Sequence, residues 1–287
     1  MDTLVTVRAD GGMSVIKDCR SLLAELEAHL SSHTAGGQTE IYNLSDKGAE
    51  LSEHAIELIG ISQGITDRTK GEFSVFAGGL VSLWSESTEL PEIGQIEKAL
   101  DSICFDPVFD GDFLKKENAD TRLEFGGIAK GYACDKAVAL MKNSGVSSGM
   151  ISFSSSIGVL GGKADGSPWK IAVKDPFDTS KNIGVIALSD GFLSVSGDYE
   201  RQYEINGKRY NHIIDLKSGC PVDNGVHSVV VIAPSGAESD ALSTAFFVMG
   251  PEGAEEYTVG TDIKYLMITD DGLFMNDGMK ALFTEAN

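Results

Sequence analysis

Apolar side chains recur at helical spacing in the first third of the chain. Five of them follow one another at steps of three or four residues: Ile16, Cys19, Leu23, Leu26 and Leu30. Because such spacing brings side chains to one face, it predicts an amphipathic helix, which the glycine pair at 36–37 is expected to end. The same spacing between Leu51 and Ser62 predicts a second helix.

The middle of the chain combines loops with helices of different length. Residues 66–120 predict loops with two short helices, one of them before Trp84 and the other near residues 96–100. A longer helix is expected to begin after the paired glycines at 126–127, because apolar residues then follow at helical spacing, and to end near residue 143.

The pattern changes to strands in the second half. Two-residue turns of the Asp-Gly or Asn-Gly type lie at 190–191, 206–207 and 271–272, and each predicts a hairpin between its flanking strands. A β-branched run at 228–232 predicts a further strand, and residues 240–249 predict a helix. Helices early in the chain and antiparallel strands late indicate an α+β fold.

Length and composition indicate a folded globular protein. The 287 residues, 42% of them hydrophobic, suffice for a single domain over residues 1–287 or for two intimately packed lobes. No apolar run approaches the roughly 18 residues of a membrane span, and no signal-peptide pattern is visible. The four cysteines are far apart and form no CxxC pair, so they predict no zinc site. Cys19 and Cys134 fall on the apolar faces of predicted helices, so we expect them to be buried thiols and not to form a disulfide.

The charge balance excludes one class of partner. Lys and Arg number 23 against 43 Asp and Glu, which gives a formal net charge of −20. Since nucleic-acid binding depends on positive potential, nucleic acid is not an expected partner. An anionic substrate would need a local source of positive potential, such as a metal ion or a helix N-terminus.

The segment from Glu124 to Tyr132 is the first candidate site. Its paired glycines allow a ligand to approach the backbone closely. The N–H groups at the start of the following helix are expected to be free, and such groups favour phosphate. Lys130 lies in the first turn, where the helix dipole opposes a cation, so an anion facing it would explain its position. A tight helix entry with a solvated lysine explains the same residues, and neither GxGxxG nor a P-loop is present.

Two further segments carry candidate chemistry. His212 and Asp215 follow a strand just before a turn rich in Gly and Pro, where a histidine serves either as a general base or as a plain hydrogen-bonding residue. Asp240 and Thr244 are four residues apart on a predicted helix, so a carboxylate and a hydroxyl share one face. These hard oxygen ligands suit Mg²⁺, whereas helix capping and back-bonding to a carbonyl explain them without a metal.

These segments, with several others in the same order, resemble the ApbE family of FAD:protein FMN transferases along nearly the whole chain. The similar blocks are Met1–Thr3 (Met-x-Thr), Thr69–Phe73 with Leu80–Trp84 (TdGxFd…PLvxLW), Leu123–Asp135 (LdlGGiaKGyavD), Asp165–Trp169 with Asp175-Pro176 (DGxPW…DP), Ser194–Tyr199 (tSGdY), Asn211–Pro221 (hHIiDPxTGxP) and Ser239–Gly250 (aDalsTalfvmG). The resemblance implies an ApbE-like, T-fold-like architecture of mixed or antiparallel sheets with packed helices. It also implies a flavin nucleotide in a cleft between two lobes.

The resemblance assigns roles to individual residues. It implies that Asp240, Thr244 and the backbone carbonyl of Gly127 hold Mg²⁺ between the protein and the pyrophosphate of FAD. Glu124 and Lys130 are implied to contact the flavin nucleotide, and His212 to be the catalytic residue. The other residues implied to line the flavin pocket are Met1, Glu72, Phe73, Ser74 and Ile213.

The implied reaction is a Mg²⁺-dependent phosphoryl transfer. A Thr or Ser hydroxyl of an acceptor protein attacks the FMN-side phosphorus of FAD, AMP leaves, and His212 assists proton removal. The resemblance also implies an acceptor in a membrane redox complex or another flavinylated protein, and a membrane-associated position outside the cytoplasm. Two alternatives stay open, namely a Mg²⁺-dependent FAD pyrophosphatase that gives FMN and AMP, and a non-catalytic FAD-binding protein.

The sequence departs from the family pattern at three places, the mildest of which is the DPxTG turn that reads DLKSG over residues 215–219. Ser154-Ser155-Ser156 replaces a GG[ND] triplet, which removes two glycines and adds hydroxyl donors. The block FDxTVGPL reads FSVFAGGL over residues 73–80, so a carboxylate and a proline are missing. We therefore expect the metal ligands and His212 to be preserved while the flavin pocket differs.

Overall fold

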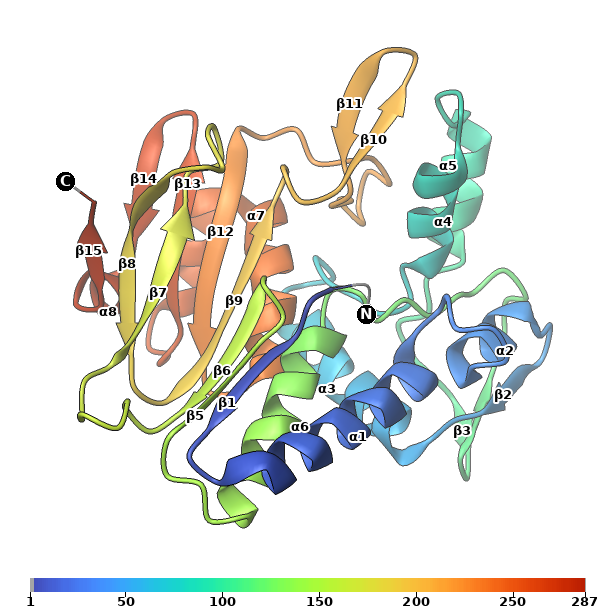
Figure 1. The fold of residues 1–287 in the computed structure, drawn as a ribbon. Coiled ribbons are helices and arrows are strands. Elements are labelled where there is room, and N and C mark those ends of the chain that lie inside the picture. Colours follow the sequence, from blue (N-terminus) through green and yellow to red (C-terminus); the bar gives the residue numbers. More distant parts are fainter. Residues whose placement is uncertain (1–2, 287) are drawn as a thin grey trace.

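The computed structural model describes residues 3–286, and its centre is a seven-stranded antiparallel sheet (Figure 1). In spatial order this sheet contains β1 (Thr6–Ala9), β5 (Gly149–Ser152), β6 (Ser156–Leu160), β9 (Gly191–Gly197), β12 (Val226–Ala233), β13 (Lys264–Thr269) and β14 (Gly272–Met275). Three smaller groups are β15 (Phe283–Glu285) with β8 (Asn182–Leu188) and β7 (Trp169–Lys174), β2 (Gly48–Glu50) with β4 (Phe113–Lys115) and β3 (Phe109–Asp110), and the hairpin of β10 (Gln202–Ile205) and β11 (Lys208–Asn211). The helices are α1 (Gly12–Leu30), α2 (Gln38–Leu44), α3 (Glu53–Arg68), α4 (Gly78–Glu86), α5 (Ile93–Asp101), α6 (Ala129–Asn143), α7 (Gly236–Thr258) and α8 (Asp277–Lys280). Over residues 3–286, none of these helices combines the length and apolarity that a membrane crossing needs.

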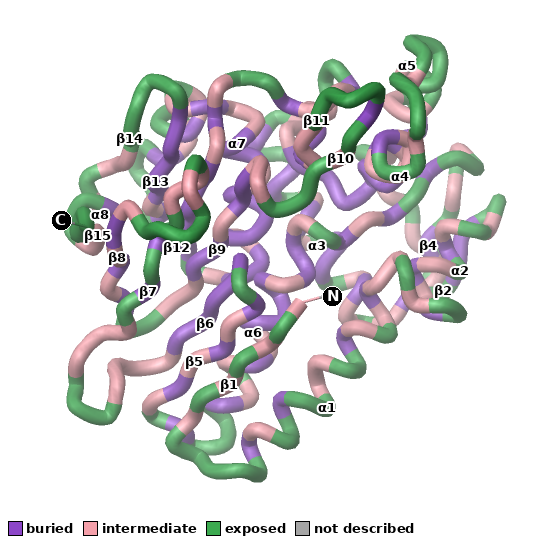
Figure 2. Tube along the Cα trace, turned by 45° about the horizontal axis from the view of Figure 1, so that its top comes forward, coloured by how far each residue is buried: buried purple, intermediate pink, exposed green. Residues whose placement is uncertain are grey.

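The central sheet is covered on both faces because its strands alternate. Val229 and Val231 of β12 pack in the main core with residues of α7. Val230 and Ile232, on the opposite face, pack against β7 and β8 in a second cluster. Figure 2 shows β9 and α7 largely in the buried colour, and Figure 1 shows β7 and β8 on the other side of β12 from α7. The result is a helix layer, a central sheet and a small outer sheet.

Most of the predicted elements are present. The helices expected from residues 16, 51 and 128 onward correspond to α1, α3 and α6. The turn at 206–207 joins β10 and β11 with a positive φ at both residues, and the turn at 271–272 joins β13 and β14. Cys19 and Cys134 are free, fully buried thiols, as predicted. Helix α7 is longer than predicted, and it kinks at Gly250, where φ is 70°.

The hairpin predicted at 190–191 is wrong. Gly191 has the positive φ that a turn needs, 118°, but β8 pairs with β7 and β15, whereas β9 pairs with β6 and β12. Leu188 of β8 and Leu193 of β9 belong to the same apolar cluster between the two sheets. The turn therefore connects two packed layers and not two neighbouring strands, a distinction that turn chemistry and alternation do not encode.

Helices α6 and α7 cross at a pair of glycines. The backbones of Gly131 and Gly236 approach so closely that a methyl group on either residue would overlap the carbonyl oxygen of the other. Asp135 of α6 accepts hydrogen bonds from the N–H groups of Gly236 (2.6 Å) and Ala237 (2.9 Å). Two otherwise free donors at the start of α7 are thereby satisfied, at the end of the helix where its dipole favours a carboxylate. Burial raises the pKa of Asp135, and these two hydrogen bonds oppose that effect.

Buried serines join α7 to β9. Ser194 and Ser196 of β9 form hydrogen bonds with Ser239 and Ser243 of α7, at 2.9 Å and 2.8 Å respectively. Two residues along a strand and four along a helix both advance about 6–7 Å, so the two pairs stay in register. Because the four hydroxyls satisfy one another, α7 can lie close to the sheet without leaving buried polar groups unpaired.

Replacement of Gly131 by alanine tests the crossing. The added methyl group forces α6 and α7 apart, and we expect Gly131→Ala to lower the free energy of unfolding by about 3 kcal/mol, measured by urea denaturation. Gly60→Ala in α3 is the matched control, because a methyl group there meets no atom within 4 Å. The control should raise the free energy of unfolding by about 0.5–1 kcal/mol. Equal effects of the two changes would contradict a close crossing.

Candidate active site

The glycine turn before α6 is held from both sides. The N–H of Gly126 donates to Oε1 of Glu124 at 2.8 Å, and Oε2 of the same carboxylate accepts a hydrogen bond from Oγ of Ser32 at 2.7 Å. A methyl group on Gly127 would lie 3.0 Å from the Phe73 ring and 3.5 Å from Oγ1 of Thr244. The turn is therefore rigid and lies directly against α7.

Asp240 is buried beside the first turn of α6. Its side chain is 4% exposed. Oδ2 accepts a hydrogen bond from the N–H of Gly131 at 2.9 Å, and Oδ1 accepts one from Oγ of Ser156 at 2.9 Å. The Lys130 ammonium group lies 3.9 Å from Oδ2. Since each carboxylate oxygen has two lone pairs, the group retains capacity to bind a cation.

Thr244 lies one helical turn after Asp240. Its Oγ1 is 3.2 Å from Oγ of Ser196, which also bonds to Ser243. The structure thus brings together Gly127, Asp240 and Thr244, the three residues predicted to hold a metal. Carboxylate, hydroxyl and carbonyl oxygens are hard donors that suit Mg²⁺ better than softer transition metals.

Lys130 faces an anion, as its position in the helix suggested. Besides lying near Asp240, its Nζ donates a hydrogen bond to the carbonyl oxygen of Gly126 at 2.9 Å. The ammonium group therefore bridges the glycine turn and the buried carboxylate. Its side chain remains 23% exposed and accessible to a ligand.

His212 directly follows β11, and its turn is anchored from α4. Nε1 of Trp84 donates to the carbonyl oxygen of Gly219 at 2.8 Å, which connects two of the segments that resemble the family. Nδ1 of His212 lies 3.1 Å from the carbonyl oxygen of Arg201. Because a carbonyl only accepts, Nδ1 carries the proton and Nε2 has a free lone pair. Burial lowers the pKa of His212 to about 4, so the ring is neutral at pH 7.

Glu200 was not among the residues predicted from the sequence, although its carboxyl group interacts with the charges of Lys130 and Asp240. Although this side chain reaches solvent, desolvation by the surrounding protein raises the pKa of its carboxyl group. Lys130 opposes this rise and Asp240 adds to it, so all three groups share one electrostatic environment. The one feature of the sequence that could have pointed to Glu200 is its position directly after the tSGdY block.

Four residues predicted to contact the flavin already have partners within the protein. Glu72 forms an ion pair with Lys217. Phe73 and Ile213 are buried in the main core, and Oγ of Ser74 accepts a hydrogen bond from the N–H of Phe76 at 3.1 Å. Their contact with flavin stays a prediction. The fifth, Met1, lies outside the described residues.

The serine triplet 154–156 is part of this site. Ser154 has a φ of 69°, a left-handed conformation that glycine adopts without strain and that other residues rarely take up. Ser156 supplies the hydroxyl that bonds Asp240. The departure from the family pattern therefore concerns the candidate metal ligand itself, and not only the flavin end as the sequence indicated.

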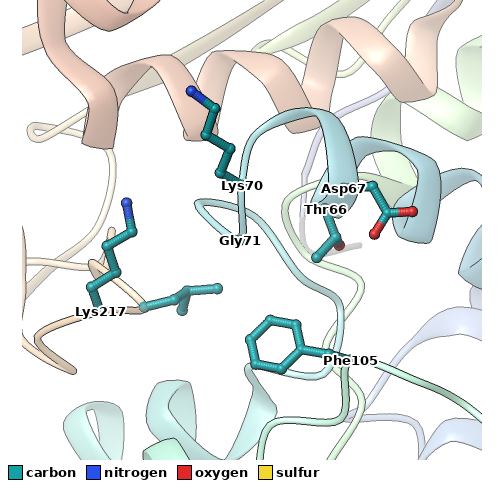
Figure 3. Close-up of a pocket in the computed structure, with 7 residues that line it drawn as sticks. Thr66, Asp67, Lys70, Gly71, Phe105 and Lys217 are labelled. Atoms are coloured by element: carbon teal, nitrogen blue, oxygen red, sulfur yellow. The ribbon is translucent and has the colours of Figure 1, made fainter.

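A hollow of about 360 Å³ lies between the segment before Glu72 and the turn after His212 (Figure 3). It is lined by Thr66, Asp67, Lys70, Gly71, Phe105, Leu216 and Lys217. Its two lysines are paired, Lys217 with Glu72 and Lys70 with Glu256 at 3.6 Å. The hollow is thus adjacent to two of the predicted flavin segments but does not include Asp240.

Comparison with known proteins identifies the family. The family model described as "ApbE family" matches residues 1–267. The chain belongs to the ApbE family. The FAD:protein FMN transferase of Escherichia coli K12 is 30% identical over 233 residues, which cover 77% of this chain and 66% of that relative. The enzyme of the same name from Vibrio cholerae is 29% identical over 255 residues, 86% of this chain and 74% of the relative.

Solved ApbE structures share the fold. The ApbE protein from Thermotoga maritima superposes with a TM-score of 0.87 at 27% identity, covering 99% of this chain and 96% of that one. The flavin transferase ApbE from Vibrio cholerae gives a TM-score of 0.86 at 25% identity, with 98% and 96% covered. The predicted family and α+β fold class are confirmed.

Ser156→Ala tests the bond that holds the Asp240 carboxylate. The change leaves a buried carboxylate oxygen without this donor, and we expect the free energy of unfolding to fall by about 1–3 kcal/mol. Ser155→Ala is the matched control, because the Ser155 hydroxyl forms no hydrogen bond with any of residues 3–286. Chemical denaturation of both variants measures the difference. A Ser156→Ala protein as stable as the control would show that Asp240 does not depend on this bond.

Proposed function

We propose that the protein transfers FMN from FAD to a Thr or Ser hydroxyl of an acceptor protein, with Mg²⁺ held by Asp240, Thr244 and the carbonyl of Gly127. The observation that carries this proposal is the meeting of these three residues beside Lys130, where α6 and α7 cross. The shared name of the relatives, FAD:protein FMN transferase, supports the same reaction.

The chemistry of the donor set fits Mg²⁺. All three groups offer oxygen, and among the described residues the one ion pair of the buried Asp240 is with Lys130 at 3.9 Å. A buried carboxylate with so distant a counter-ion favours a further cation. When bound, Mg²⁺ offsets negative charge on the pyrophosphate and on the leaving AMP.

The protein's own groups provide the remaining positive potential. Lys130 and the positive end of the α6 dipole lie at the pyrophosphate end of the proposed site, although the N–H groups of Ile128, Ala129 and Gly131 already have acceptors within the protein. Together they supply the local positive potential that a chain of net charge −20 needs in order to attract an anionic nucleotide. The flavin end rests, in this proposal, on Glu72, Phe73, Ser74, Glu124 and Ile213.

His212 acts as the general base. The lone pair on Nε2 takes the proton of the acceptor hydroxyl while the hydroxyl oxygen bonds to the FMN-side phosphorus. The bond from this phosphorus to the AMP oxygen breaks, and AMP leaves. The acceptor belongs to a membrane redox complex or is another flavinylated protein, encountered outside the cytoplasm, as the family resemblance implies.

Incubation with FAD, Mg²⁺ and an acceptor polypeptide that carries a Thr or Ser target tests this function. Flavin fluorescence that stays with the acceptor in a denaturing gel is the expected result. FMN and AMP without labelled acceptor would identify a pyrophosphatase instead. Intact FAD bound to the protein would identify a carrier.

Asp240→Asn should abolish the response to Mg²⁺. Loss of the charged ligand is expected to lower the rate of acceptor labelling by at least about 100-fold, since a bound metal contributes several kcal/mol to such a step. Asp271→Asn, in the exposed turn between β13 and β14, makes the same chemical change away from the site and should retain the rate. A Mg²⁺ titration of the labelling rate measures both. An Asp240→Asn enzyme with an unchanged Mg²⁺ response would contradict the metal assignment.

His212→Asn should separate catalysis from structure. The asparagine amide can still donate to the Arg201 carbonyl but provides no base, so we expect kcat to fall about 10²–10⁴-fold with little change in the KM for FAD.

The dependence of the wild-type rate on pH tests the protonation state of His212. Because the pKa of His212 is lowered to about 4, protonation of this residue should cost the wild-type rate less than about twofold between pH 7 and pH 5.5. A histidine at its ordinary pKa would lose about tenfold over that range.

A further inference from the structure

A second group of metal-binding side chains lies outside the candidate active site. Glu25 and His29 are four residues apart on α1, and His54 is in the first turn of α3. One ligand atom from each lies within 4.8 Å of the others. Residues four apart on a helix share one face, so the pair on α1 faces a third ligand from another helix. The reaction proposed above uses none of the three.

His29 presents a buried nitrogen without a partner. Its Nδ1 is inaccessible to solvent and forms no hydrogen bond with the described part of the chain. The backbone is fixed at this point, because Oγ1 of the buried Thr39 donates to the His29 carbonyl at 2.9 Å. An unsatisfied buried nitrogen costs about 1–3 kcal/mol, so its presence needs a physical reason.

The hydrogen bonds around His54 leave its other nitrogen free. Partial burial disfavours ionisation of Glu57, but hydrogen bonds from Lys136 and Tyr132 lower the pKa of Glu57 below its ordinary value. As an ionised carboxylate Glu57 only accepts, so the Tyr132 hydroxyl donates to it, at 2.6 Å. The oxygen of Tyr132 must then accept from Nδ1–H of His54, at 3.0 Å. The lone pair of His54 is therefore on Nε2, which lies 3.9 Å from Oε1 of Glu25.

We propose that Glu25, His29 and His54 form a binding site for a late first-row divalent cation of the Zn²⁺ class. Two imidazoles and one carboxylate are ligands that Zn²⁺ accepts and that Mg²⁺ does not select. Two ligands of tetrahedral Zn²⁺ are about 3.3 Å apart, so the 3.9 Å between His54 and Glu25 closes with a small side-chain movement. The Glu25 side chain is 57% exposed, which gives the ion a path from solvent and leaves a coordination position for water.

The groups around the proposed site provide the hydrogen-bond acceptor that a metal-ligating histidine usually has. Such histidines usually donate their second N–H to an oxygen that fixes the tautomer, and Tyr132 provides that oxygen for His54. Glu57 is already neutralised by Lys136 at 2.7 Å, so Glu25 is the anionic ligand. A bound cation joins α1 to α3 directly, and reaches α6 through Tyr132.

Titration of the protein of residues 1–287 with ZnCl₂ in excess MgCl₂ tests this proposal. The Mg²⁺ occupies the oxygen-donor site, and isothermal calorimetry should then show one equivalent of Zn²⁺ bound. His29→Ala and His54→Ala should each raise the Kd at least 100-fold. His33→Ala, an exposed histidine just beyond the end of α1, is the matched control and should leave the Kd unchanged. Co²⁺ should give the visible absorption of a low-coordinate site in the wild type and lose it in both ligand variants.

Tyr132→Phe examines the hydrogen bond behind His54. Without that oxygen the tautomer is no longer fixed, and the Kd for Zn²⁺ should rise about 10–100-fold. Thermal denaturation without Zn²⁺ shows whether each variant is folded, and the Zn²⁺-induced rise in Tm should follow the order of affinities. The proposal is overturned if the wild type binds no stoichiometric Zn²⁺, or if folded His29→Ala and His54→Ala proteins bind it as the wild type does.

Discussion

The close backbone contact of Gly131 and Gly236 is the constraint on which the candidate active site depends. It allows α6 and α7 to cross without intervening side chains, and Asp135 fixes the crossing by capping α7. The glycine turn and Lys130 at the start of α6 then lie directly beside Asp240 and Thr244 on α7. Were the helices a side chain further apart, these oxygen donors could not lie together as a candidate cation site.

The buried polar groups around this crossing form hydrogen bonds with one another. Asp240 accepts from a backbone N–H and from Ser156, while the serines of β9 and α7 bond to one another. These hydrogen bonds hold the candidate metal ligands in place at little cost in desolvation. They leave a carboxylate whose charge is only partly compensated, and therefore ready for a cation.

Helix α6 connects two sites of different chemistry. Lys130 belongs to the oxygen-donor site, and two residues later Tyr132 supports the His54 side of the histidine–glutamate group. Ligand type separates the cations that the two sites favour, because carboxylate, hydroxyl and carbonyl oxygens suit Mg²⁺ whereas imidazoles suit Zn²⁺. We therefore expect the two proposed sites to take up different cations independently.

Most of the local elements and the identity of the candidate ligands could be predicted from the sequence alone. Periodicity located α1, α3 and α6, turn chemistry located the β10–β11 hairpin, and ordered motifs selected Gly127, His212, Asp240 and Thr244. Three features became visible only in the folded chain: β8 and β9 belong to different sheets, Ser156 forms a hydrogen bond with Asp240, and the side chains of Glu25, His29 and His54 lie together. Each of these depends on contacts between segments far apart in the chain or between packed layers. Local pattern carries no information about such contacts, because the same alternation or helical spacing is compatible with many partners.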